Sequence, residues 1–169
     1  MTTVYLARHA EVNGYFSLPP FPKEEEKGDK DPELNSEGKR NSRRLGRHLR
    51  EIGACPKAIY TTPFLRGIQT AFGIKESFPN ISIFQDGFLE DDPAEEPAAS
   101  IVERMTSAFE YYLSKHQGKE IVIVSHGFPT ALLRWRLLNP DAELINKGQL
   151  NDDEILDKAE AWKLVIDEE

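Results

Sequence analysis

Two apolar segments of this sequence each end in a histidine, and this feature constrains the fold more than any other. The first segment runs over residues 4–9 as Val-Tyr-Leu-Ala-Arg-His, and the second runs over residues 121–127 as Ile-Val-Ile-Val-Ser-His-Gly. A short run of β-branched residues that ends in polar residues is typical of a buried parallel strand. Because the carboxyl ends of parallel strands open onto one crevice, we expect Arg8, His9 and His126 to meet there.

Length, charge and cysteine content exclude several classes of protein. The chain has 169 residues, which suits a single domain over residues 1–169. Its 29 acidic and 21 basic residues give a net charge of −8, which disfavours nonspecific binding to nucleic acid or to an anionic membrane. Cys55 is the only cysteine, and no segment has the pattern of a signal peptide or of a membrane span. We therefore expect a cytoplasmic protein without nucleic-acid or membrane partners.

Strand-like and helix-like segments alternate along the chain, which predicts an α/β fold. The sequence predicts strands at residues 3–8, 58–61, 81–84 and 121–125. It predicts helices at residues 36–52, after Pro63, at 98–116 and at 130–138. In the tail, residues 154–157 and 162–166 are expected to pair as a hairpin, with a short helix as the alternative.

Residues 13–33 predict a long loop directly after the first histidine segment. The loop contains four prolines, a run of lysine and glutamate, and the aromatic residues Tyr15, Phe16 and Phe21. Loops longer than about 15 residues inside a compact domain are usually functional lids or disordered excursions. The aromatic side chains favour a lid that selects the substrate, and a solvated insertion is the alternative.

A third polar segment belongs with the two histidine strands. Residues 61–66, Thr-Thr-Pro-Phe-Leu-Arg, place Arg66 in the first turn of a helix, where the helix-terminal amides also favour an anion. Guanidinium groups pair with phosphate oxygens, and histidine can attack phosphorus covalently. We therefore expect Arg8, His9, Arg66 and His126 to bind a phosphoryl group.

Four segments, in this order, resemble motifs of the histidine phosphatase superfamily, the phosphoglycerate-mutase-like group. Leu-Ala-Arg-His-Ala-Glu at residues 6–11 is similar to the family's Arg-His-Gly signature. The other three similar segments are residues 34–46, 59–71 and 122–127. The resemblance covers residues 4–133 and implies a three-layer α/β/α sandwich with a mostly parallel sheet.

The resemblance also implies a role for each residue of the site. His9 would be the nucleophile that becomes phosphohistidine, and its second ring nitrogen is expected to bind a backbone carbonyl, which sets the tautomer. The phosphoryl oxygens would be surrounded by Arg8, Arg66, His126 and Gly127, with His126 also catalytic.

A general acid must protonate the leaving oxygen. The family places this acid after the third strand in a Leu-x-Glu-like setting, so the resemblance implies Glu90, which follows Phe-Leu at residues 88–89. Three other carboxylates are alternatives: Glu11, Asp91 and Asp92.

The implied function is that of a small, metal-independent phosphatase without a cofactor. It would hydrolyse a phosphorylated metabolite or a phosphorylated protein side chain through phosphohistidine. Phosphotransfer of the mutase type is less expected, because mutases carry larger insertions. The family usually has glycine at position 10, a hydroxyl residue at 12 and asparagine at 15, where this chain has Ala10, Val12 and Tyr15. These departures leave a catalytically weak phosphate-recognition module as an alternative.

Overall fold

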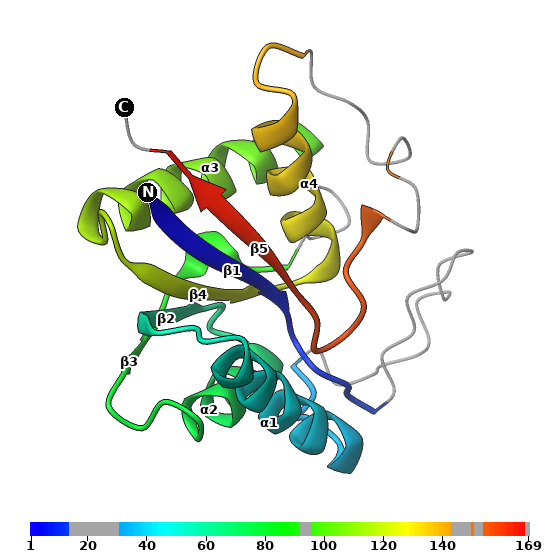
Figure 1. The fold of residues 1–169 in the computed structure, drawn as a ribbon. Coiled ribbons are helices and arrows are strands. Elements are labelled where there is room, and N and C mark those ends of the chain that lie inside the picture. The colour runs from blue at the N-terminus through cyan, green and yellow to red at the C-terminus, as the bar shows by residue number, and fades with distance from the viewer. Residues whose placement is uncertain (14–30, 92–95, 143–149, 151–153, 168–169) are drawn as a thin grey trace, which may run out of the picture.

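The computed structural model describes residues 1–13, 31–91, 96–142, 150 and 154–167 (Figure 1). Along the chain the elements are β1 (Thr2–Arg8), α1 (Ser36–Glu51), β2 (Pro56–Thr61), α2 (Leu65–Lys75), β3 (Ser82–Gln85), the short 3-10 helix η1 (Gly87–Leu89), α3 (Ala98–Lys115), β4 (Glu120–Ser125), α4 (Gly127–Leu138) and β5 (Ala161–Ile166). The predicted alternation of strands and helices is confirmed.

The strands form one mostly parallel sheet in the order β3-β2-β4-β1-β5. Four strands are parallel, and β5 runs antiparallel to β1 at one edge. The central strand β4 is fully buried over residues 121–124, which accounts for its continuous apolar sequence. Arg8 is the register partner of Ser125, so β1 and β4 end at the same level and present the residues that follow them at one edge.

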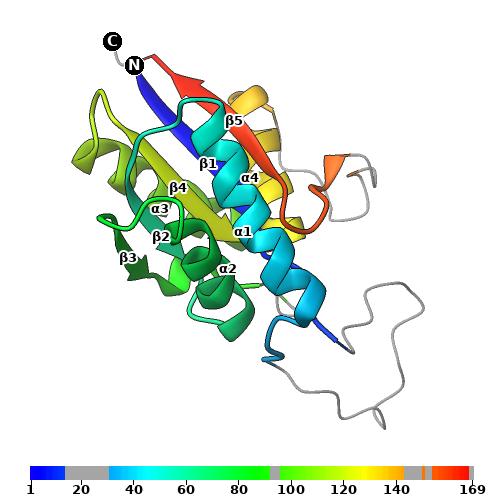
Figure 2. The same ribbon diagram turned by 60° about the horizontal axis from the view of Figure 1, so that its bottom comes forward.

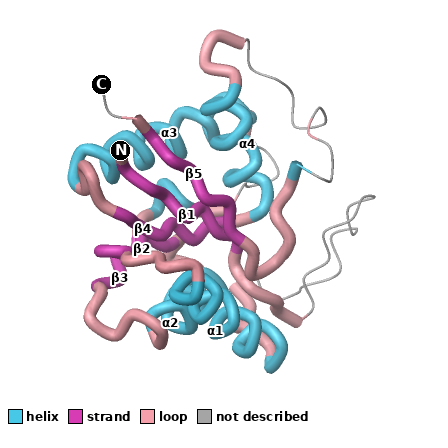
Figure 3. The backbone as a smooth tube through the Cα atoms, in the orientation of Figure 1, coloured by secondary structure: helices cyan, strands magenta, loops and turns pink. Residues whose placement is uncertain are grey.

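Helices cover both faces of this sheet. Figures 1, 2 and 3 show α1 and α2 side by side on one face and α3 and α4 on the other. Alternate residues of β1 supply the two cores: Leu6 packs in the cluster of α3 and α4, and Tyr5 packs in the cluster of α1 and α2. The predicted three-layer α/β/α sandwich is therefore confirmed. No described helix has the length and apolarity needed to cross a membrane.

The start of α1 is fixed against the segment that follows β1. The side chain of Asn35 accepts a hydrogen bond from the Gly38 amide at 2.8 Å, which caps the helix. A Cβ atom on Gly38 would collide with the carbonyl oxygen of Glu11, so only glycine permits this close approach. The helix therefore begins directly beside the chain that leaves the first histidine strand.

Two element predictions differ from the structure. The predicted hairpin of the tail is wrong, because residues 154–157 form no strand and residues 162–166 pair instead with β1. This pairing completes the β1 edge and packs Trp162 and Leu164 against the core of α3 and α4. Helix α4 also begins at Gly127 and not at residue 130, because Pro129 is tolerated in the first turn of a helix. Residues 14–30 of the predicted loop lie outside the described residues.

Candidate active site

The ends of β1 and β4 bring the two predicted histidines together. The His9 amide donates to the carbonyl oxygen of Ser125 at 3.0 Å, which continues the register of the two strands past their ends. The imidazole rings of His9 and His126 meet edge to face, with 5.2 Å between their centroids. Both side chains are buried. The two strand ends therefore lie side by side, as the sequence predicted.

The surroundings of His9 define the nitrogen that can act as a nucleophile. Its Nδ1 lies 2.8 Å from the carbonyl oxygen of Ala10, which can only accept, so Nδ1 carries the proton. Nε2 therefore keeps its lone pair, as the sequence predicted for the tautomer. Burial, followed by repulsion from His126, Arg66 and Arg8, lowers the pKa of His9 from 6.5 to about 3. The ring is neutral at neutral pH, which is the form that can attack phosphorus.

Arg8 projects from the end of β1 toward the start of α4. Its Nη1 donates to the carbonyl oxygen of Leu156 at 2.9 Å, so the segment before β5 holds the guanidinium in place. A Cβ atom on Gly127 would come within 2.9 Å of the Arg8 Cζ atom, and the glycine thus makes room for the guanidinium. Because α4 begins at Gly127, the positive end of its helix dipole lies beside Arg8.

Arg66 is fully buried at the start of α2. Its Nη2 binds Oδ2 of Asp91 at 2.7 Å, and its Nη1 lies 3.6 Å from Oδ1 of Asp31. The same Oδ2 of Asp91 lies 3.3 Å from Nδ1 of His126. The Asp91 carboxylate thus bridges Arg66 and His126.

His126 is held by its neighbours in a neutral form. Its Nε2 lies 3.1 Å from the hydroxyl oxygen of Thr62, the residue that follows β2. Burial lowers the pKa of His126 well below its usual range, and Arg66, Arg104 and Arg8 lower it further. With both imidazoles neutral at neutral pH, the positive charge beside them is that of arginine side chains, among them Arg8 and Arg66.

The candidate acids lie in different places. Asp91 contacts Arg66 and His126. The Glu90 side chain is exposed, and its Oε1 lies toward Gly87. None of the contacts among the described residues joins the Glu90 carboxylate to His9. Glu11 accepts a hydrogen bond from the side chain of Asn41 on α1 at 2.9 Å. Asp92 lies outside the described residues.

A sequence signal for Asp91 exists in the register of the Leu-x-Glu-like motif. Leu89 is 1% exposed and anchors the loop, whereas Phe88 is 53% exposed. If the buried Leu89 occupies the leucine position of the motif, the acid two residues later is Asp91. If the exposed Phe88 occupies that position, the acid is Glu90. The resemblance alone could not choose between these registers.

Arg104 of α3 holds the loop that carries these acids, and sequence reasoning missed it. Its Nη1 donates to the carbonyl oxygens of Phe88 and Glu90 at 2.7 and 2.9 Å, and its Nη2 donates to that of Asp91 at 3.2 Å. Its other contacts go to the carboxylate of Glu96. Since an arginine in an amphipathic helix is usually an exposed charge, the sequence carries no signal for this role.

Thr70 is a second residue of the site that the sequence did not single out. The Ala10 amide donates to its hydroxyl oxygen at 2.9 Å, and the hydroxyl donates to the Arg66 carbonyl oxygen at 2.7 Å. Thr70 thus joins the segment after His9 to the helix that carries Arg66. Its place in the third resembling segment was the available signal.

The structure describes two of the three residues that depart from the family pattern. Ala10 is fully buried, and among the described residues other than glycine only Ala159 has a positive φ, of 57°. The backbone at Ala10 therefore suits any residue, and its methyl group causes no backbone strain. Val12 forms a bridge with Leu34. Tyr15 lies outside the described residues.

The sequence matches the family model of the histidine phosphatase superfamily (branch 1) over residues 4–91 and 82–156. No curated protein matches it. The family match covers all four of the strand-end and helix-start residues: Arg8, His9, Arg66 and His126.

Solved structures share the fold. YhfR from Bacillus stearothermophilus superposes with a TM-score of 0.65 at 21% identity, over 87% of this chain and 88% of that one. A mutant phosphoserine phosphatase from Entamoeba histolytica in complex with phosphoserine gives 0.65 at 17% identity, also over 87% and 88%. The protein histidine phosphatase SixA, complexed with tungstate, gives 0.60 at 20% identity over 80% and 76%.

Proposed function

Because this chain belongs to branch 1 of the histidine phosphatase superfamily, we propose that it is a phosphatase that forms a phosphohistidine on His9. Its substrate is a phosphomonoester or a phosphorylated protein side chain. One observation carries the proposal: a buried, neutral His9 directs its Nδ1 proton to a backbone carbonyl, and the cationic side chains of Arg8 and Arg66 share its site. This arrangement combines a nucleophilic nitrogen with positive charge for phosphoryl oxygens.

The reaction has two steps. In the first, Nε2 of His9 attacks phosphorus, the bond from phosphorus to the leaving oxygen breaks, and an acid donates a proton to that oxygen. Arg8 and Arg66 neutralise the charge on the equatorial oxygens in this transition state. In the second step, water attacks the phosphohistidine, the acid residue takes up the proton, and His9 and inorganic phosphate are released.

For the acid, the contacts favour Asp91 over Glu90. The Asp91 carboxylate binds Arg66 and lies near His126, where the phosphoryl oxygens would bind. A phosphoryl group would displace this carboxylate from Arg66 and leave it beside the leaving oxygen. From that position a protonated carboxyl group donates to the leaving oxygen, which is the role of the general acid.

A rapid-quench experiment tests the nucleophile. Wild-type protein mixed with radiolabelled substrate should yield acid-labile, base-stable phosphate on His9, and His9→Ala should yield none and lose turnover. His116→Gln changes a histidine outside this site and is the matched control, with the fold of both variants checked by circular dichroism. Wild-type turnover by His9→Ala would disprove the assignment.

Metal independence is a second testable part of the proposal. In this reaction two arginines supply the charge that a metal ion supplies elsewhere, and no cofactor takes part. Turnover should therefore survive thorough chelation and be inhibited by vanadate. Loss of turnover on chelation, with recovery on adding a divalent ion, would contradict this part.

The alternative is a phosphate-recognition module. In either function a phosphoryl group has to compete with the Asp91 carboxylate for Arg66. A recognition module would bind a phosphorylated ligand without trapped phosphohistidine and without release of phosphate, so the same quench separates the two functions. A mutase would transfer the trapped phosphate to a second alcohol and not to water.

A further inference from the structure

A groove lies between α1 and β5, on the face of the sheet that α1 and α2 cover. Its volume is about 910 Å³. Tyr5 of β1 and Leu45 and Leu49 of α1 contribute apolar side chains to its lining. Lys163 is the register partner of Tyr5 and therefore lies on the same face of the sheet, where it is exposed. Beside α1, this face of β5 is open to a partner.

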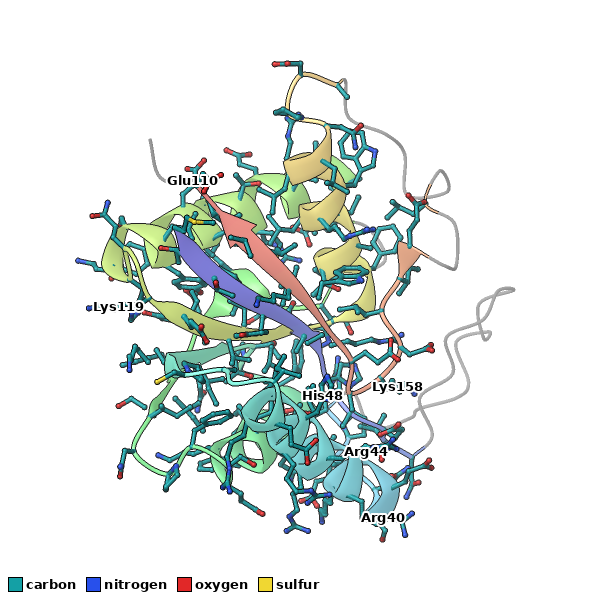
Figure 4. All side chains as sticks on the ribbon, in the orientation of Figure 1. Arg40, Arg44, His48, Glu110, Lys119 and Lys158 are labelled. Carbon is teal, nitrogen blue, oxygen red and sulfur yellow. The ribbon has the colours of Figure 1, made fainter. Side chains whose placement is uncertain are left out.

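The walls of this groove carry positive charge. Arg44 and Arg47 line it from α1, and Lys158 and Lys163 line it from β5 and the segment before it. Figure 4 shows Arg44 of α1 and Lys158 on the same side of the molecule, with Arg40 farther along the helix. None of the four lining cations forms an ion pair with a described residue, whereas Arg43 on the same helix binds Glu76 at 2.9 Å.

The charge of this basic groove is opposite to that of the whole protein. Four cations and two carboxylates, Glu51 and Glu160, line it, whereas the chain has a net charge of −8. A long polyanion such as nucleic acid or a membrane surface would meet the negative remainder of the protein. A short acidic segment would meet only the local cations, so charge complementarity favours an acidic polypeptide.

An extended segment would match both the apolar and the charged lining of the groove. Consecutive side chains of an extended chain point to opposite sides, so apolar residues can face the floor while alternate acidic residues face the rim. Arginine suits such a rim, because its guanidinium can bind a carboxylate through two parallel hydrogen bonds. Arg44 and Arg47 are one helical turn apart and lie on the same side of α1.

One wall of the groove is also part of the active site. The carbonyl oxygen of Leu156, which lines the groove, accepts the hydrogen bond from Arg8 Nη1. The Ala159 amide, in the same wall, donates to the His9 carbonyl oxygen at 3.3 Å, and the Arg8 amide donates to that of Glu160 at 3.1 Å. A polypeptide in the groove would thus lie against the segment that supports the nucleophile.

We propose that the basic groove binds an acidic, extended segment of a phosphoprotein substrate and brings its phosphorylated side chain to His9. The proposal rests on the phosphatase function proposed above and selects phosphoproteins among its substrates. Binding of the segment itself needs no turnover, so it can be tested separately.

The binding test uses two fluorescein-labelled, unphosphorylated peptides, one alternating glutamate with valine and one alternating lysine with valine. Fluorescence anisotropy should show binding of the glutamate peptide, weaker at higher salt, and at least about tenfold weaker binding of the lysine peptide. The double variant Arg44→Glu, Lys158→Glu should weaken binding of the glutamate peptide by about tenfold, because it replaces two attractions with repulsions. The matched control Lys39→Glu, Arg50→Glu changes α1 outside the groove and should bind as the wild type does.

Turnover is measured with the same peptides carrying a central phosphoserine and with nitrophenyl phosphate. The kcat/KM ratio of the acidic phosphopeptide to nitrophenyl phosphate should fall about tenfold in the groove variant and stay constant in the control variant. Equal binding of both peptides, unchanged binding by the groove variant, or tighter binding of an oligothymidylate would overturn the groove proposal. Absence of hydrolysis of every substrate, with intact binding of the glutamate peptide, would overturn the phosphatase function and leave the acidic-segment site standing.

Discussion

The two sides of the candidate site are built in different ways. Arg8, His9 and His126 lie at the ends of adjacent parallel strands, so the hydrogen-bond register of the sheet places them. Asp91 lies in an irregular loop, and Arg104 of α3 holds that loop through its carbonyl oxygens. The side that holds the proposed nucleophile, the nucleophile side, is therefore specified by short-range patterns along the strands. The side that holds the proposed acid, the acid side, depends on a distant side chain. A loop placed in this way can be disturbed while the nucleophile remains intact.

The broadest effect, on every substrate, is expected at Arg66, which lies on the same side of the site as His9 because it follows β2. Arg66→Met should lower kcat/KM for every phosphate ester by about 10²–10³, because a fixed donor to the transition-state oxygens is lost. Steady-state kinetics with aryl and alkyl phosphates would show the same factor for both. A loss confined to poor leaving groups would contradict a role in charge stabilisation. Thermal unfolding should accompany the assay, because the buried arginine also binds Asp91.

Removal of the acid should give a loss that depends on the leaving group. Asp91→Asn should slow alkyl phosphates by about 10²–10⁴ and nitrophenyl phosphate far less, because general acid catalysis matters where the departing oxygen is basic. Glu90→Gln is the matched variant, one residue away with an exposed side chain. If Glu90→Gln shows the leaving-group dependence and Asp91→Asn does not, the acid is Glu90, as the resemblance implied. A loss in neither variant would place the acid elsewhere.

Most of the nucleophile side could be predicted from the sequence, and the acid side could not. The apolar runs before His9 and His126 specify buried strands, and parallel strands place their carboxyl ends at the same edge of the sheet. The side chain of Asp91 is placed by a contact between α3 and a loop, and no local pattern records such a contact. The pairing of residues 162–166 with β1 was missed for the same reason, because a hairpin is a local solution and the β1 edge is distant in sequence.

Arg104 should have a smaller effect that tests this difference. Arg104→Met should lower turnover of alkyl phosphates by about tenfold and reproduce the leaving-group dependence of Asp91→Asn, because the loop loses its anchor. Arg43→Met is the matched control, since it removes an exposed arginine that also pairs with a glutamate. Combining Arg104→Met with Asp91→Asn should cost little more than Asp91→Asn alone. Fully additive losses would show that Arg104 acts independently of the acid.

The smallest effect on turnover, and a measurable one on stability, is expected from the titration of His9. Its pKa is about 3 in the folded protein and about 6.5 in the unfolded chain, so the unfolded state takes up a proton first as the pH falls. The contribution of His9 to stability is thus fully present above pH 6.5 and is lost progressively as the pH falls toward 3. Below pH 6.5 the slope approaches about 1.4 kcal/mol per pH unit.

Two measurements check that the stability of the protein falls as the pH falls. The ¹⁵N resonances of His9 should keep the Nδ1-protonated pattern from pH 7 to pH 5, whereas the histidines of the urea-unfolded chain should titrate in this range. Denaturant unfolding at the two pH values should give a lower free energy of unfolding at pH 5, and His9→Gln should reduce the difference. If folded His9 takes up a proton near pH 6, its ring is not held neutral by burial. The fold of the strand ends would then not set the neutral form of the nucleophile, and the contrast with the acid side would disappear.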